Sequence, residues 1–206
     1  MIKNKLWVFG DSFSSLYTNE PFGIEYNEYL GYKAKTFSEV IADKEELELI
    51  NMARGGNDNY TILESICANV DKIKKDDYII VGWSDYVRFR LVENGKWKPY
   101  NNAGMDYLLE KILVNRENKL VTDEVCNWTK MLKKLYGNKI LFWSWCKKGY
   151  GCNDIILPID HNRGIFKNSI DIQTKFKVND SHLNEDGHKL LSELFISTMF
   201  IEKRVI

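Results

Sequence analysis

Apolar residues along the chain alternate between short unbroken runs and longer stretches with helical spacing. The unbroken runs predict buried strands at 5–9, 47–52, 77–83 and 139–145. The helical spacing predicts helices at 36–46, 60–73, 107–136 (as two helices that break near Asn118) and 185–202. Strands without polar alternation are typical of parallel sheets that are covered on both faces.

The repeated strand-helix alternation predicts the fold class. We expect a three-layer α/β/α protein with an open, mainly parallel sheet of the flavodoxin-like kind. The turn sequence Glu93-Asn94-Gly95-Lys96 predicts a small hairpin over 88–97, outside this sheet. The irregular, polar stretch 149–179 is expected to form a lid or one wall of a cleft. All 206 residues, 1–206, are expected to make one domain.

Charge and composition exclude several classes of partner. The 29 basic and 29 acidic residues cancel, so no surface that follows a phosphate backbone is expected and nucleic acid is not a predicted partner. No stretch approaches the roughly 18 apolar residues of a membrane span. The run Leu6–Phe9 is too short for the core of a signal peptide. We therefore expect a cytoplasmic protein without a membrane partner; no oligomeric state is indicated.

The cysteines do not predict a metal site. Cys67, Cys126, Cys146 and Cys152 form no C-x-x-C pair and show no Cys/His spacing typical of zinc. Reduced thiols are expected, with a loop disulfide between Cys146 and Cys152 as the alternative.

Three unusual loops follow three of the predicted strands. They are Gly10-Asp11-Ser12, Gly55-Gly56-Asn57 and Gly82-Trp83-Ser84-Asp85. Right-handed crossovers place the loops that follow parallel strands along one edge of the sheet, where ligands bind in such folds. The sequence therefore predicts a functional site built from these loops.

Ser12 and His182 are the residues in or near this edge that suit nucleophilic chemistry. A serine hydroxyl is a nucleophile only with a base within hydrogen-bond reach, and the alternative role of Ser12 is to cap a helix. Histidine changes charge near neutral pH, which suits it to move protons. Asp180, two positions before His182, could accept the other ring N–H. The alternative for His182 is a loop residue beside a helix start.

The remaining candidates are weaker. The backbone N–H of Gly56 could point into the cleft and stabilise an oxyanion, although paired glycines also serve simply to allow a turn with positive φ. Asn57 and Asn59 could each donate a side-chain N–H in the same loop. His188 is expected to be structural, and His161 to be a solvated loop residue.

Taken in order, these segments resemble the SGNH/GDSL hydrolase family over nearly the whole chain. The four matching blocks are Phe9-Gly10-Asp11-Ser12, Asn51-Met52-Ala53-Arg54-Gly55-Gly56, Gly82-Trp83-Ser84-Asp85 and Asp180-Ser181-His182-Leu183-Asn184. The resemblance implies that Ser12 is the nucleophile and that the N–H groups of Ser12 and Gly56 are oxyanion donors. It also implies that His182 is the base, and that an acyl-enzyme forms without a metal or organic cofactor.

Two positions depart from the family pattern. Ser84 stands where the family has an asparagine that serves as the third oxyanion donor. The Ser84 hydroxyl is expected to donate one hydrogen bond there from a shorter side chain, and loss of one donor can cost roughly 10²–10³ in rate unless Asn57 or Asn59 substitutes. Asn179 stands three residues before His182, where the family has aspartate. Asp180 is the expected acid, and a Ser-His dyad is the alternative. A loose similarity to phage-encoded relatives rests on the Gly-Trp-Ser and Asp-x-His forms and on Arg88.

The resulting prediction is an esterase that removes a small acyl group such as acetyl from a carbohydrate. The chain is rich in aromatic residues, and two of them near the sheet edge, Trp83 and Trp143, are expected to be available for stacking on a sugar. One alternative is a binding or structural module that kept the fold and lost the chemistry. Another is an acyltransferase that uses the same site with a sugar as the acceptor.

Overall fold

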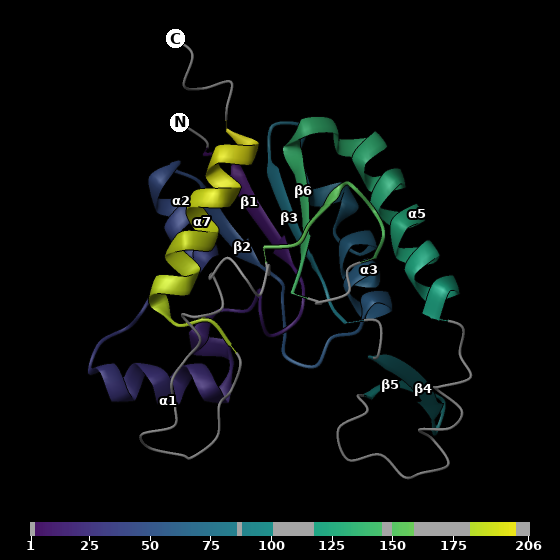
Figure 1. The fold of residues 1–206 in the computed structure, drawn as a ribbon, viewed down its shortest axis with the longest axis horizontal. Coiled ribbons are helices and arrows are strands. Elements are labelled where there is room, and N and C mark those ends of the chain that lie inside the picture. The colour runs from purple at the N-terminus through teal and green to yellow at the C-terminus, as the bar shows by residue number, and fades with distance from the viewer. Residues whose placement is uncertain (1–2, 86–87, 101–117, 146–149, 159–181, 201–206) are drawn as a thin grey trace.

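The computed structural model describes residues 3–85, 88–100, 118–145, 150–158 and 182–200. Its centre is an open, entirely parallel five-stranded sheet (Figure 1). The strands are β1 (Lys5–Phe9), β2 (Glu48–Asn51), β3 (Tyr78–Trp83), β6 (Ile140–Ser144) and β7 (Ile155–Ile156), in the spatial order β2-β1-β3-β6-β7. The four predicted strands and the fold class are confirmed.

Helices cover both faces of the sheet. α2 (Phe37–Lys44) and α7 (Glu185–Met199) lie on one face, and α3 (Asn59–Cys67) and α5 (Asn118–Tyr136) lie on the other (Figure 1). Each face has its own apolar core, because successive strand residues point to opposite sides. Leu6 and Val8 of β1 join the core under α2 and α7, and Trp7 and Phe9 join the core under α3 and α5.

Several helix boundaries differ from the predictions. The predicted helix 60–73 begins at Asn59, where the Asp58 side chain caps it, and ends at Cys67; a separate 3-10 turn, η2 (Val70–Lys72), follows. Residues 107–117 of the predicted segment 107–136 lie outside the described residues, and 118–136 form α5. In α7 the buried apolar side chains are Leu191, Phe195 and Ile196, whereas Leu190 is 40% exposed.

Three elements were not expected from the pattern. α1 (Pro21–Leu30) starts with a proline at its first position, follows the 3-10 turn η1 (Tyr17–Asn19), and buries fully only Gly23, while Phe22, Tyr26 and Leu30 are partly buried against Tyr17 and Ala34. β7 has two residues and lies inside the stretch expected to be irregular. A third 3-10 turn, η3 (Gly137–Lys139), joins α5 to β6. β7 and η3 are too short to leave a periodic signal.

The predicted hairpin is present as a separate two-stranded sheet. β4 (Phe89–Glu93) pairs antiparallel with β5 (Lys96–Tyr100). The turn between them places Asn94 at a φ of 51° and Gly95 at a φ of 73°. Positive φ at both central residues is what a tight two-residue hairpin requires.

Trp83 and Trp143 belong to the core. Both side chains are fully buried, and the Trp83 indole donates to the Thr129 hydroxyl at 2.9 Å. The expectation that these two residues stack on a sugar is therefore wrong. They end strands whose two faces are both covered by helices, so their indoles point into the layers and away from solvent.

His188 lies in the core between Tyr17 and Phe37, with ring centroids 5.2 and 5.8 Å away. Burial lowers the pKa of His188 to about 3, and the nearby His182 adds to this shift. The unfolded chain binds a proton at His188 below its ordinary pKa near 6.5, whereas the native state does not until the pH nears 3. Stability is therefore lost as the pH falls through this window.

We expect the free energy of unfolding to drop by about 2 kcal/mol between about pH 7.5 and about pH 5 because of His188 alone. Urea denaturation of the wild type and of His188→Phe at both pH values measures this component as a difference between the two losses. An equal loss in both proteins would contradict it.

Two further observations concern membrane-spanning helices and the cysteines. Within the described residues, no helix is long and apolar enough to span a membrane. Cys67, Cys126 and Cys152 are free thiols. Cys146 lies outside the described residues.

The strand order places a topological switch point between β1 and β3. The chain moves from β1 outward to β2 and then crosses back to β3 on the other side of β1. Ligands of open α/β sheets bind at this point, outside the carboxyl ends of the strands. Ser12 follows β1, and Ser84 follows β3.

Candidate active site

Ser12 lies in a tight turn directly after β1. The Asp11 carboxylate accepts a hydrogen bond from the Phe13 N–H at 3.0 Å, and the Asp11 carbonyl accepts one from the Ser14 N–H at 3.0 Å. A short carboxylate that accepts from the backbone two residues on stabilises such a turn. Asp11 therefore holds the turn that presents Ser12 at the carboxyl end of the sheet.

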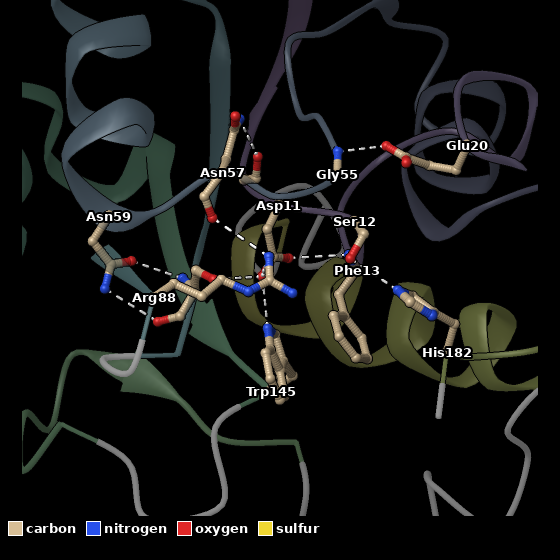
Figure 2. A network of polar contacts seen from close by, with 12 residues as sticks. Asp11, Ser12, Phe13, Glu20, Gly55, Asn57, Asn59, Arg88, Trp145 and His182 are labelled. Atoms are coloured by element: carbon tan, nitrogen blue, oxygen red, sulfur yellow. Dashed lines mark hydrogen bonds and ion pairs between the residues drawn. The ribbon is translucent and has the colours of Figure 1, made fainter. Parts of the chain in front are cut away.

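His182 reaches the same point from the start of α7. Its Nε2 lies 2.8 Å from Ser12 Oγ (Figure 2). This is the reach that a general base needs. The following residue, Leu183, is held by the Tyr17 hydroxyl, which donates to its carbonyl at 2.8 Å. Burial raises the pKa of Tyr17, so the hydroxyl keeps the proton that it donates.

The ring of His182 is enclosed between two phenylalanines. Phe22 of α1 stacks on one face with a centroid distance of 3.9 Å, and Phe13 stacks with a distance of 4.4 Å. Both ring pairs are within 24° of parallel. Stacking on an aromatic plane resists rotation of that plane, so the two contacts help to keep Nε2 directed at Ser12.

The buried carboxylate of Asp11 collects several donors. Its Oδ2 accepts from the Ser84 hydroxyl at 2.8 Å and from the Trp145 indole N–H at 2.8 Å, and Arg88 Nη1 lies 3.3 Å away (Figure 2). Only 1% of Asp11 is exposed. A buried carboxylate is tolerated when it is paired and hydrogen-bonded, and these donors meet that requirement.

The loop after β2 is fixed from two sides. The Gly55 N–H donates to the Glu20 carboxylate at 2.5 Å, and the Asn57 side-chain amide donates to the Gly10 carbonyl at 3.0 Å. Gly56 adopts a φ of +81°, which L side chains rarely adopt. The loop is thereby tied both to the end of β1 and to the segment that leads into α1.

Two backbone donors at these loops are unused. Within the described part of the chain, the N–H groups of Ser12 and Gly56 have no hydrogen-bond partner. An unpaired N–H group costs free energy when it is kept from water, and this applies to Ser12, which is buried; Gly56 is exposed, so solvent can reach its N–H. Free donors beside a nucleophile are the arrangement that stabilises an oxyanion.

Ser84 and Asn59 have a different role from the expected one. The Ser84 N–H donates to Asn59 Oδ1 at 2.8 Å, and Asn59 Nδ2 donates to the Ser84 carbonyl at 3.1 Å and to the Tyr150 hydroxyl at 2.9 Å. Both amide protons of Asn59 are thus used. The single hydroxyl proton of Ser84 goes to Asp11. In this arrangement neither side chain can donate to an oxyanion, which corrects the expectation for both.

The remaining predicted site residues divide into two groups. Asn57 uses one amide proton on Gly10, and the other has no partner among the described residues. Asp180, Asn179 and His161 lie outside the described residues, so the choice between a triad and a dyad stays a prediction. Across the described ranges, no group of three or more His, Cys, Asp or Glu side chains is placed to hold a metal ion.

Three residues that shape the site were not predicted from the sequence. Trp145 directly follows β6, and its position at the same sheet edge was a usable signal. Glu20 and Phe22 flank the start of α1, whose usable signal was the helical spacing of Phe22, Tyr26 and Leu30. Their short segment contacts both the loop of Gly55 and the ring of His182, and only the folded chain brings these together.

Among the comparisons with known proteins, one solved structure supports the fold. No family model matches the sequence, and no curated protein matches it. The chain is similar to a carbohydrate esterase whose active site is described as displaying divergent catalytic and non-catalytic binding functions. The TM-score is 0.51 and the identity 16%, over 100% of this chain and 66% of that one. This chain thus spans just under two thirds of the length of that esterase.

A second structure has a lower score. The psychrotrophic esterase EstA from Pseudoalteromonas sp., inhibited by monoethylphosphonate, aligns with a TM-score of 0.47 and 13% identity over 97% of both chains. At such identities the likeness concerns the architecture alone.

Proposed function

We propose that this protein is a serine esterase in which Ser12 is the nucleophile and His182 the general base. The observation that carries the proposal is the 2.8 Å contact between Ser12 Oγ and His182 Nε2 at the topological switch point of the sheet. The free N–H groups of Ser12 and Gly56 support it, because they lie on the two loops that flank the nucleophile.

The proposed reaction proceeds through an acyl-enzyme. His182 Nε2 takes the Ser12 hydroxyl proton while Oγ bonds to the ester carbonyl carbon, and the carbonyl π pair moves onto oxygen as an oxyanion. When the oxyanion collapses, the ester C–O bond breaks and the alcohol leaves with the proton from His182. Water then repeats the sequence on the acyl-enzyme, releasing the acid and restoring Ser12.

Asp180 is proposed as the residue that accepts the other ring N–H of His182 and so completes a triad. Such an acid fixes the tautomer and stabilises the imidazolium that forms. The alternative is a Ser-His dyad, in which the Phe13 and Phe22 rings orient His182 without an acid. Turnover of Asp180→Ala compared with Asn179→Ala distinguishes the two, since only the triad predicts a selective loss in Asp180→Ala.

We propose a small acyl ester of a carbohydrate, such as an acetyl ester, as the substrate class. The support is the likeness in fold to a carbohydrate esterase. The commitment of the Ser84 proton to Asp11 favours a second candidate, a binding module with weakened or lost chemistry. Transfer of the acyl group to a sugar would use the same steps, with the sugar hydroxyl in place of water.

A fluorophosphonate probe tests the nucleophile directly. We expect the intact protein to be labelled at Ser12, as located by mass spectrometry of the modified peptide, and Ser12→Ala to lose all labelling. Ser15→Ala is the matched control, because Ser15 is a neighbouring serine that is also buried. Failure of the intact protein to react would contradict the esterase and favour the binding module.

A further inference from the structure

Two backbone N–H groups are the only oxyanion donors so far assigned from the described residues. The side chain of Ser84, which stands in the place of the third donor, and that of Asn59, another expected donor, are both committed elsewhere. A tetrahedral oxyanion that forms in a site screened from water is stabilised by each further donor, and by a charged donor most of all.

Arg88 contacts the residues that adjoin the two backbone donors in sequence. Its Nη1 is 3.3 Å from Asp11 Oδ2 and 3.5 Å from the Asn57 carbonyl oxygen. Asp11 directly precedes Ser12, and Asn57 directly follows Gly56, so one guanidinium nitrogen bridges the neighbours of the two free N–H groups. In Figure 2 the Arg88 side chain lies between Asn57 and Trp145, over Asp11.

The guanidinium has donors to spare. Both contacts to described residues use Nη1, whereas a guanidinium paired with a carboxylate commonly binds through two nitrogens. The group packs against the Trp145 ring, with its central carbon 5.7 Å from the ring centroid, which holds it in place. The side chain is 15% exposed, so it is neither sealed in the core nor free in solvent.

We infer that Arg88 is the third oxyanion donor and directs its Nη2 edge at the carbonyl oxygen of the ester. This inference rests on the proposed function. Asp11 then has two roles, because its carboxylate holds both the turn of Ser12 and the guanidinium of Arg88. As Ser12 attacks, the carbonyl π pair moves onto the oxygen, and its new negative charge faces the Arg88 cation; no proton leaves the guanidinium.

Steady-state hydrolysis of p-nitrophenyl acetate by Arg88→Ala, Arg88→Gln and Arg88→Lys tests the inference. We expect kcat to fall by about 10²–10³-fold in the alanine and glutamine variants with little change in KM, because the interaction arises only in the transition state. Lysine should restore part of the loss. Millimolar guanidinium chloride should restore part of the Arg88→Ala activity and leave the wild type unaffected.

Arg90→Ala is the matched control. Arg90 follows Arg88 by two residues, and its side chain is 13% exposed. It pairs with Glu64 at 2.6 Å, and Glu64 is not a residue of the candidate site. We expect its kcat to stay near that of the wild type. Circular dichroism of each variant reports folding, and guanidinium rescue reports the donor even where Arg88→Ala is destabilised.

The outcomes separate this inference from the proposed function. A wild-type protein that fluorophosphonate labels at Ser12, together with an Arg88→Ala variant of unchanged kcat, overturns the role of Arg88 alone. A raised KM with unchanged kcat also overturns it, since that result assigns Arg88 to ground-state binding. A wild-type protein that is neither labelled nor active overturns both.

Discussion

Replacing His182 with alanine is expected to lower kcat for p-nitrophenyl acetate by at least about 10²-fold, the loss typical of a missing general base. The reason is geometric: within the described residues Nε2 of His182 is the only basic ring nitrogen in contact with Ser12 Oγ, at 2.8 Å. Added imidazole should restore part of the lost activity, because a free base can enter the space that the side chain leaves.

Asn184→Ala provides the matched control for this variant. Asn184 lies two residues further on and caps α7 by accepting from the Gly187 N–H at 2.9 Å, so its loss should cost about 1 kcal/mol of stability. We expect turnover of this variant to remain close to wild type. A His182→Ala protein with near wild-type turnover would remove His182 from the mechanism.

Replacing Asp11 with alanine is expected to affect both stability and turnover. The change leaves the Phe13 N–H, the Trp145 indole, the Ser84 hydroxyl and the Arg88 guanidinium without their shared acceptor. Removing one partner of a buried charged pair costs about 3–5 kcal/mol, and we expect the low end because Arg88 is partly exposed. Urea denaturation measures this loss.

The same change should lower kcat by at least about 10²-fold, because the turn of Ser12 and the position of Arg88 both depend on Asp11. Asp11→Asn is expected to lower both kcat and the free energy of unfolding, as Asp11→Ala does. Whichever way the amide is turned, its NH₂ group faces a donor, either the Phe13 N–H or the cluster of donors at Oδ2.

Asp77→Ala separates the two effects. Asp77 is 3% exposed and accepts from the Lys5 N–H, the Trp7 indole and the Lys74 N–H at 2.9 to 3.0 Å, so it is a comparable buried carboxylate. It precedes β3 and therefore lies at the amino ends of the strands, away from the site. We expect a similar loss of stability with turnover retained. Equal losses of turnover in both variants would assign the Asp11 effect to stability alone.

The sequence alone determined the layers of the fold and the sheet edge at which the candidate site lies. Residues such as Tyr78 to Val81 form an unbroken apolar run, because a parallel strand between two helical layers is buried on both faces. That signal depends only on neighbouring residues, so it can be read from the sequence. The loops after β1, β2 and β3 could likewise be placed at one sheet edge, since right-handed crossovers leave them nowhere else.

Only the tertiary structure decided which polar groups remain free for chemistry. Ser84 stands in the place of a donor, yet its proton is taken by Asp11, 73 positions earlier in the chain. Trp145 is 134 positions from the same carboxylate, and Arg88 joins it from the segment after β3. A hydroxyl has one proton to donate, and its acceptor depends on which distant side chains folding brings within about 3 Å, a distance that no local pattern encodes.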